Sequence, residues 1–194
     1  MAIYTYGVEN VTPETKHGIV RTTNLKATYA GHLFDVVHAS QDLDNGMNVK
    51  IGDHVTADGR ECVDATFPAI GDKIALVADV VKFYDTSTTA KQAEYNYYIP
   101  QGQPARAYEV EQYDKFGVSD YMFTTKVGAA VAVGNYVTVD GNGKWKEIVS
   151  TSAPDAAATG FIGKVYGFDT VDNEKIVLIE TIQNVQIQSP GVGG

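Results

Sequence analysis

Apolar and polar residues alternate in short runs along most of this chain, and turn-forming residues separate the runs. Such alternation is typical of half-buried β-strands, because successive side chains of a strand point to opposite faces. The clearest case is 137–148, where Val-Thr-Val and Lys-Trp-Lys-Glu-Ile flank Asp-Gly-Asn-Gly. Asp-Gly and Asn-Gly supply the positive φ angles that a tight hairpin turn needs. The pattern predicts strands at residues 32–38, 48–57, 73–84, 94–99, 107–112, 119–124, 136–140, 144–149, 160–168 and 175–182.

Helical periodicity is weak throughout the sequence. Only residues 86–93, or alternatively 153–159, could form a helix of about two turns. Residues 1 to about 28 show no sustained period, so we expect an extended arm with at most one short strand. The last residues, 186–194, end in Ser-Pro-Gly-Val-Gly-Gly, which indicates a flexible tail or a segment that docks on a partner.

An internal repeat organises the middle of the chain. Val-Lys-Ile-Gly-Asp-His-Val-Thr-Ala-Asp-Gly at 49–59 matches Val-Ala-Val-Gly-Asn-Tyr-Val-Thr-Val-Asp-Gly at 131–141. Duplication of a β unit explains the match, and convergence is the alternative, because an apolar-Gly-Asp turn often leads into a strand. Duplication predicts that the glycine at the fourth position of each copy lies at a turn. It also predicts that the valine at the seventh position of each copy is buried.

Duplication divides the chain into an N-terminal arm (1–29), a first β unit (30–103), a second β unit (104–185) and a flexible tail (186–194). Each unit is small for an independent fold, so the two share one pseudo-symmetric barrel or pack as twin barrels. We therefore expect an all-β protein of one or two small barrel or sandwich units with extended arms at both ends.

Charge, cysteine content and hydropathy limit the partners and sites that this protein can have. The 194 residues include 24 acidic and 15 basic side chains, a net charge of −9, which argues against nucleic acid and anionic lipid as partners. The single cysteine excludes an intramolecular disulfide and a zinc site of several thiolates. No apolar run reaches the roughly 18 residues of a membrane span, and the first residues do not look like a secretion signal.

Candidate catalytic and metal-ligating residues are few. His32 and His38 would share one face of a strand, but two ring side chains beside a buried stripe explain them equally. A nucleophilic Cys62 would need His54 to approach it in the fold, and a lone cysteine is usually a small buried hydrophobe. The acidic turns at 42–46 and 140–143 lack the further ligands of a calcium loop. The sequence predicts a protein without enzymatic activity, metal or cofactor.

Aromatic residues are the remaining candidates for binding. Those around residues 95–98 form either an aromatic core between the units or a contact surface for protein or sugar. The first residues hold too few apolar side chains for a core, yet an extended strand there would present one aromatic face. The candidate partner-binding residues are Ile3, Tyr4, Tyr6, Val8, Val11, Tyr95, Tyr97 and Tyr98.

Three successive segments carry a resemblance to a known family. They are Gly-Asn-Tyr-Val-Thr-Val-Asp-Gly-Asn-Gly-Lys-Trp at 134–145, Ala-Thr-Gly-Phe-Ile-Gly-Lys-Val-Tyr-Gly at 158–167 and Lys-Ile-Val-Leu-Ile-Glu at 175–180. In this order they resemble the decoration (cement) proteins of tailed bacteriophage heads, small β proteins with a hairpin, a loop and two further strands. The repeat extends the resemblance loosely back to Gly52. This chain is nearly twice the minimal unit of the family and has a longer N-terminal arm.

The resemblance implies a virion structural protein, made in the host cytoplasm, that binds the outer capsid surface and bridges capsid subunits. Its partners would be the major capsid protein and other copies of itself, with no nucleic acid and no membrane. The terminal arms would add strands to the sheet edges of neighbours. Two alternatives stay open: a tail or baseplate component, and a carbohydrate-binding module in which the tyrosines and Trp145 line the site.

Overall fold

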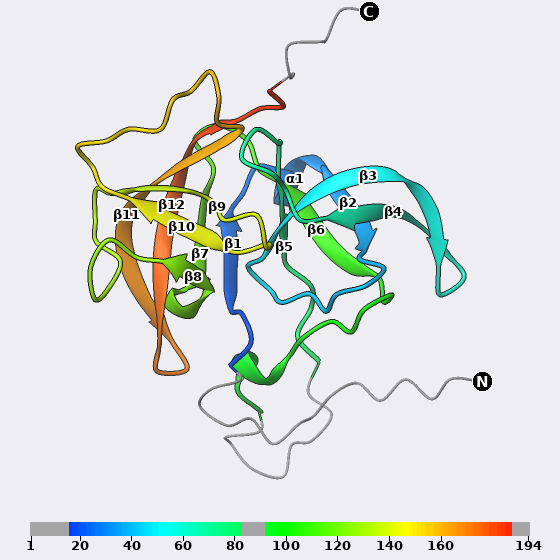
Figure 1. Ribbon diagram of the computed structural model, residues 1–194. Helices are drawn as coiled ribbons and strands as arrows, with labels where there is room; N and C mark the ends of the chain where they lie inside the picture. The colour runs from blue at the N-terminus through cyan, green and yellow to red at the C-terminus, as the bar shows by residue number, and fades with distance from the viewer. Residues whose placement is uncertain (1–15, 83–91, 188–194) are drawn as a thin grey trace, which may run out of the picture.

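The structure is a computed structural model that describes residues 16–82 and 92–187 (Figure 1). Nearly all of its regular structure is β, which confirms the predicted fold class. The strands are β1 (Val20–Asn24), β2 (Leu33–Val37), β3 (Asn48–Ala57), β4 (Arg60–Thr66), β5 (Ala75–Val77), β6 (Ala105–Glu109), β7 (Lys115–Ser119), β8 (Phe123–Thr125), β9 (Tyr136–Val139), β10 (Trp145–Ile148), β11 (Phe161–Val171) and β12 (Glu174–Asn184). The short helical elements are α1 (Ala27–Ala30) and the 3₁₀ turns η2 (Glu94–Asn96) and η3 (Asp120–Met122).

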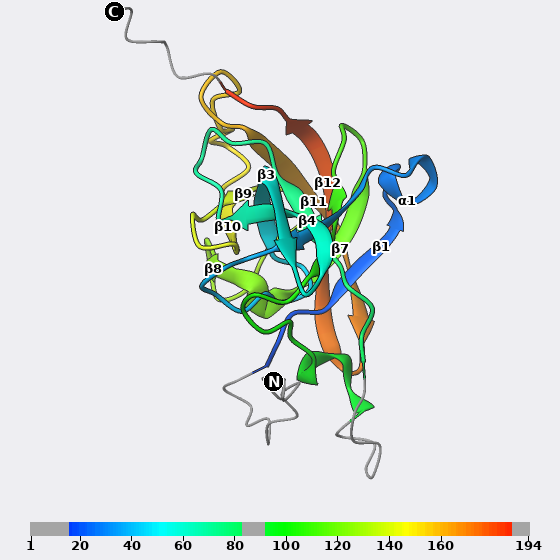
Figure 2. The same ribbon diagram turned by 90° about the vertical axis from the view of Figure 1, so that its right-hand side faces the viewer.

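The strands form two sheets. One is a closed barrel with the order β2-β4-β3-β5-β6, and the other has seven strands in the order β1-β7-β12-β11-β9-β10-β8. Figure 1 shows the β3–β4 hairpin reaching away from the second sheet, and Figure 2 shows the long strands β11 and β12 of that sheet with β1 and β7 beside them.

Both sheets repeat one strand order. In the barrel, β2 pairs in parallel with β4 and antiparallel with β6. In the second sheet, β8 pairs in parallel with β10, and β7 pairs antiparallel with β12. Because only η3 separates β7 from β8, this continuous stretch occupies the place that β2 has in the barrel. The remaining orders, β4-β3-β5-β6 and β10-β9-β11-β12, then correspond strand for strand, which supports duplication.

The two copies of the sequence repeat agree in their hairpins. The Asp-Gly pairs at 58–59 and 140–141 both follow a strand, and both turn it back into the next one. Asp58 and Gly59 have φ angles of 49° and 72°, and Gly141 has a φ angle of 89°. Positive φ at these positions is what the two hairpin turns require.

The copies differ at their first glycine. Gly134 lies at a turn with a φ angle of 89°, as duplication predicts. The same prediction was wrong for Gly52, which lies inside β3 where the ladder with β4 is irregular. The reason is that β3 already pairs with β5 at Asn48, so the chain is extended before this glycine. Val137 is fully buried, whereas Val55 is only half-buried.

Several strand predictions hold and others do not. The range 48–57 coincides with β3, and the predictions at 32–38, 136–140, 144–149, 160–168 and 175–182 fall on β2, β9, β10, β11 and β12. The predicted strand 94–99 is wrong, because η2 turns the chain there before Ile99 bridges to Leu43. Residues 153–159 form turns rather than a helix, and 86–93 lies largely outside the described residues.

Residues 16–29 of the predicted arm pack into the fold. β1 pairs with β7 at the edge of the second sheet, and the flanking Ile19 and Leu25 are buried. The backbone N–H of Lys26, just before α1, donates to the buried carboxylate of Asp114 at 3.0 Å. At the other end, the N–H of Ile187 donates to the carbonyl of Gly71 at 2.8 Å. Residues 1–15 and 188–194 lie outside the described part.

Buried residues of both sheets form one contiguous apolar core. Trp145 of β10 packs against Phe116 and Phe161, with ring centroids 5.5 and 5.3 Å away. Its indole N–H crosses to the barrel side and donates to the carbonyl of Gly46 at 2.8 Å. Asn184 of β12 likewise donates its amide to the carbonyl of Ile74 at 2.8 Å. The two sheets therefore stabilise each other.

Candidate interaction surface beside the N-terminal strand

The residues before β1 meet the tyrosine-rich segment around η2. Gly18 makes this approach feasible, because a Cβ atom there would lie 1.8 Å from the carbonyl oxygen of Asn45. A larger residue would force the segment away from the turn at 42–46. The local sequence Gly18-Ile19-Val20 therefore combines a close backbone approach with the start of the sheet.

His17 is held from four sides at this point. Its backbone N–H donates to the carbonyl of Tyr95 at 2.9 Å, and its Nδ1 lies 2.8 Å from Oδ1 of Asp44. Its ring stacks on Tyr98 with centroids 4.7 Å apart and an interplanar angle of 24°. Its carbonyl accepts a hydrogen bond from the hydroxyl of Tyr121. We call His17 and these four partners the N-terminal anchor.

Charge and burial reinforce the anchor. Lys16 pairs with Glu174 of β12, and its Nζ also lies 5.2 Å from the ring centre of Tyr95. Burial raises the pKa of Tyr121, so its hydroxyl stays protonated and remains a hydrogen-bond donor to His17. The chain therefore enters β1 from a fixed position and direction.

The predicted partner-binding tyrosines are found in and beside this anchor. Tyr97 is buried in the core, and its hydroxyl donates to Oδ2 of Asp79 at 2.6 Å. Tyr95 and Tyr98 are half-buried and contact residues 16 and 17. Contact of these tyrosines with another protein stays a prediction. The other predicted contact residues, Ile3, Tyr4, Tyr6, Val8 and Val11, lie outside the described residues.

The two histidines considered as metal ligands have separate environments. The ring of His32 is exposed, and its Nδ1 lies 3.0 Å from Oε2 of Glu109. His38 is buried against Phe67, and its Nδ1 accepts a hydrogen bond from the N–H of Gln41 at 3.1 Å. Burial lowers the pKa of His38. Within residues 16–82 and 92–187, no group of three His, Cys, Asp or Glu side chains is arranged to hold a metal.

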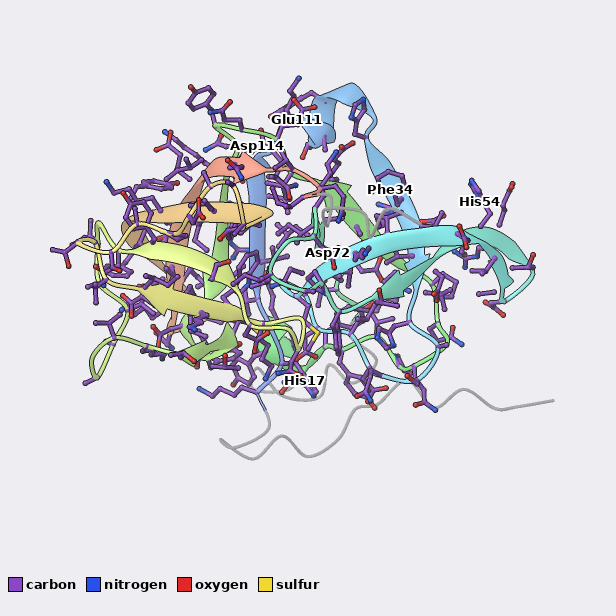
Figure 3. The ribbon with its side chains drawn as sticks, turned by 45° about the horizontal axis from the view of Figure 1, so that its top comes forward. His17, Phe34, His54, Asp72, Glu111 and Asp114 are labelled. Atoms are coloured by element: carbon purple, nitrogen blue, oxygen red, sulfur yellow. The ribbon has the colours of Figure 1, made fainter. Side chains whose placement is uncertain are left out.

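Cys62 does not have the surroundings of an activated nucleophile. Its side chain is buried, and burial raises the pKa of the thiol, which disfavours the reactive thiolate. His54, the histidine considered as its base, is exposed on the outward β3–β4 hairpin (Figure 3).

Trp145 is also unsuited to the role that the carbohydrate-binding alternative requires. It is fully buried and takes part in the aromatic core, so it cannot stack on a sugar. The nearby acidic turn is closed by its own backbone, because Oδ1 of Asp140 accepts from the N–H groups of Asn142 at 2.7 Å and Lys144 at 2.9 Å. The carbohydrate-binding alternative therefore lacks the exposed tryptophan that it requires.

Sequence reasoning missed the partners that make the anchor. Asp44 and Tyr121 lie 27 and 104 residues from His17, and no spacing rule connects them. The one local signal was the glycine after His17, which precedes two apolar residues and indicates a close approach.

Comparisons of the chain with protein-family models, with curated proteins and with solved structures give no match. None of the helices in the described residues has the length and apolar character needed to cross a bilayer.

Proposed function

We propose that this protein is a capsid decoration protein that binds the outer surface of a tailed-bacteriophage head and bridges capsid subunits. The observation that carries the proposal is the fold of residues 134–180, the part that resembles this family. They form β9, the Asp-Gly hairpin, β10, a loop, β11 and β12, in the order that the resemblance implies.

The anchor supports a docking role for the residues before it. A docking segment that ends at residue 15 would begin beside His17. Four kinds of contact hold His17 in place. A fixed starting point reduces the conformational entropy that a docking segment loses on binding. The net charge of −9 also suits an outward position, away from packaged DNA.

Deleting residues 1–12 tests the proposal. The shortened chain should keep its β core, because that core begins with the anchor and β1. Its affinity for purified heads that lack this protein should fall by roughly tenfold or more, about 1.4 kcal/mol. The measurement is occupancy on heads against added protein, beside a thermal melt of the free chain. Full-strength binding would reject the arm as a docking element, and a collapsed melt would show that it belongs to the core.

A matched pair of variants separates aromatic contact from chain length. Replacing Tyr4 and Tyr6 by serine should reproduce most of the loss, whereas replacing Glu9 and Asn10 by serine should not. The full-length chain also distinguishes the tail alternative, because a decoration protein binds purified heads and a tail component binds purified tails. Binding to neither particle would refute both versions of the proposal.

A further inference from the structure

A polar pocket of about 200 Å³ lies on the barrel, and two of its lining residues, Tyr97 and Ile99, flank Tyr98 of the anchor. Residues from β2, β4 and β6 line it, together with the segments that follow β5 and η2. Its volume is below the roughly 300–1,000 Å³ of pockets that take drug-sized ligands, so it suits one small ligand. Its lining includes Asp35, Arg60, Asp79, Lys82, Gln103 and Arg106.

The two arginines of this pocket are not neutralised by the protein. Within the described residues, neither Arg60 of β4 nor Arg106 of β6 forms an ion pair or a side-chain hydrogen bond. Asp35 stands opposite Arg106 in the β2–β6 ladder, yet the two do not form an ion pair. By contrast, Arg21 on the second sheet is paired with Glu94 at 3.3 Å. The pocket therefore presents two guanidinium groups that can donate to an oxyanion.

Gln103 adds a neutral polar group to the pocket. The residue is 5% exposed and lines the pocket, and its side-chain amide makes no hydrogen bond to the described residues and is open to solvent. The amide can both donate to and accept from a ligand hydroxyl.

The charges around the pocket set the charge of the ligand. Asp79 accepts a hydrogen bond from the Tyr97 hydroxyl at 2.6 Å and lies 4.0 Å from Nζ of Lys82, so these two charges offset each other. Among the described lining residues, the two arginines then face one carboxylate, Asp35, which leaves a single positive charge. A ligand with one negative charge and several hydroxyl groups satisfies the arginines, Asp35 and Gln103 together.

We propose that this pocket binds an acidic sugar of the hexuronate class. The sugar carboxylate would lie between Arg60 and Arg106, and its hydroxyl groups would hydrogen-bond to Gln103 and Asp35. Another pocket in the described part of the chain lies beside β3 and β5, and its two lysines are already paired, Lys50 with Asp72 and Lys73 with Glu109. It therefore suits an anionic ligand less well than the arginine pocket does. The proposal goes beyond capsid attachment, because none of the five anchor residues lines this arginine pocket.

Titration calorimetry of the full chain tests the proposal with sodium glucuronate near neutral pH. Glucuronate should bind saturably, and glucose, which has the ring without the charge, should bind more weakly by roughly tenfold or more. Acetate, which has the charge without the ring, should also bind more weakly. Equal binding of glucose or acetate, tighter binding of glucose 6-phosphate, or no saturable binding of glucuronate would overturn the proposal.

Variants locate the binding in the pocket. Arg60→Gln and Arg106→Gln should each weaken glucuronate binding by roughly tenfold or more, because each removes a charged donor. Both side chains are exposed at the surface, so we expect both variants to fold. Lys146→Gln makes the same charge change on the exposed side of β10 and should leave binding unaltered. Unchanged affinity in both arginine variants, with unchanged melting, would show that glucuronate binds elsewhere and would refute the site.

Discussion

Replacing Glu147 by glutamine should destabilise the protein, although the two side chains have nearly the same size. Glu147 lies on β10 and is 2% exposed. Its Oε1 accepts hydrogen bonds from the N–H of Ala132 at 2.8 Å and from the amide of Asn135 at 2.7 Å. Its Oε2 accepts from the N–H of Val127 at 2.7 Å. One buried carboxylate therefore holds the connection between β8 and β9 against β10.

The magnitude follows from these three bonds. Glutamine keeps one oxygen, but its NH₂ group replaces the other and faces a backbone N–H, so a donor opposes a donor. A hydrogen bond to a charged acceptor contributes about 1.5–3 kcal/mol. The other two bonds persist but lose their charged acceptor. Together these effects should cost about 2–4 kcal/mol, a large share of the roughly 5–15 kcal/mol that stabilises a typical domain.

Urea unfolding followed by far-ultraviolet circular dichroism measures this cost. The control is Glu61→Gln, the same substitution at an exposed position of β4, which should change the free energy of unfolding by at most about 0.5 kcal/mol. Glu147→Gln should lower the midpoint well below that of the control. Equal stability of the two variants would refute the reasoning that the buried carboxylate holds the connection.

Three further predictions concern stability and pH. Burial lowers the pKa of His38, so its contribution to stability should be fully present above the unfolded pKa of 6.5 and should decrease as the pH falls below that value. His38→Gln should remove this pH dependence of the melting temperature, and an unchanged pH dependence would contradict the prediction. Burial alone would raise the pKa of Asp72, but hydrogen bonds, above all from Lys50, lower it overall. The stability that Asp72 contributes should therefore be present above pH 3.8 and be lost as the pH falls through its lower folded pKa. Asp72→Asn should reduce this loss of stability in acid, and an unchanged loss would show that the ion pair with Lys50 contributes nothing. Trp145→Phe should cost about 2–4 kcal/mol in denaturant unfolding, because it leaves a void and an unpaired Gly46 carbonyl in the core; a loss below about 1 kcal/mol would contradict this account.

The sequence by itself determined the β class and the hairpins. The strand at 48–57 and the hairpin at 137–148 could be predicted because alternation and Asp-Gly turns are local properties of the chain. The repeat likewise pointed to two related units, and β3 and β9 occupy corresponding places in their sheets. The strand and hairpin predictions depend only on residues that are close together in the sequence, and the repeat depends on comparing two such local segments.

Tertiary structure decided the partners of these elements. The segment 94–99 alternates like a strand, yet it turns at η2 and pairs with residues far away in the sequence. β4 was not predicted, because its charged residues obscure the alternation that pairing with β3 and β2 makes regular.

The same limit applies to the candidate binding residues. The partners of His17 come from three distant segments, and Arg60 and Arg106 line the same pocket because β4 and β6 both pair with β2. Trp145 is buried rather than exposed because Phe116 and Phe161 pack against it and Gly46, in the turn before β3, accepts its N–H. Backbone pairing and burial depend on which distant segments lie side by side, and local alternation specifies that a strand has a buried face but not what covers it.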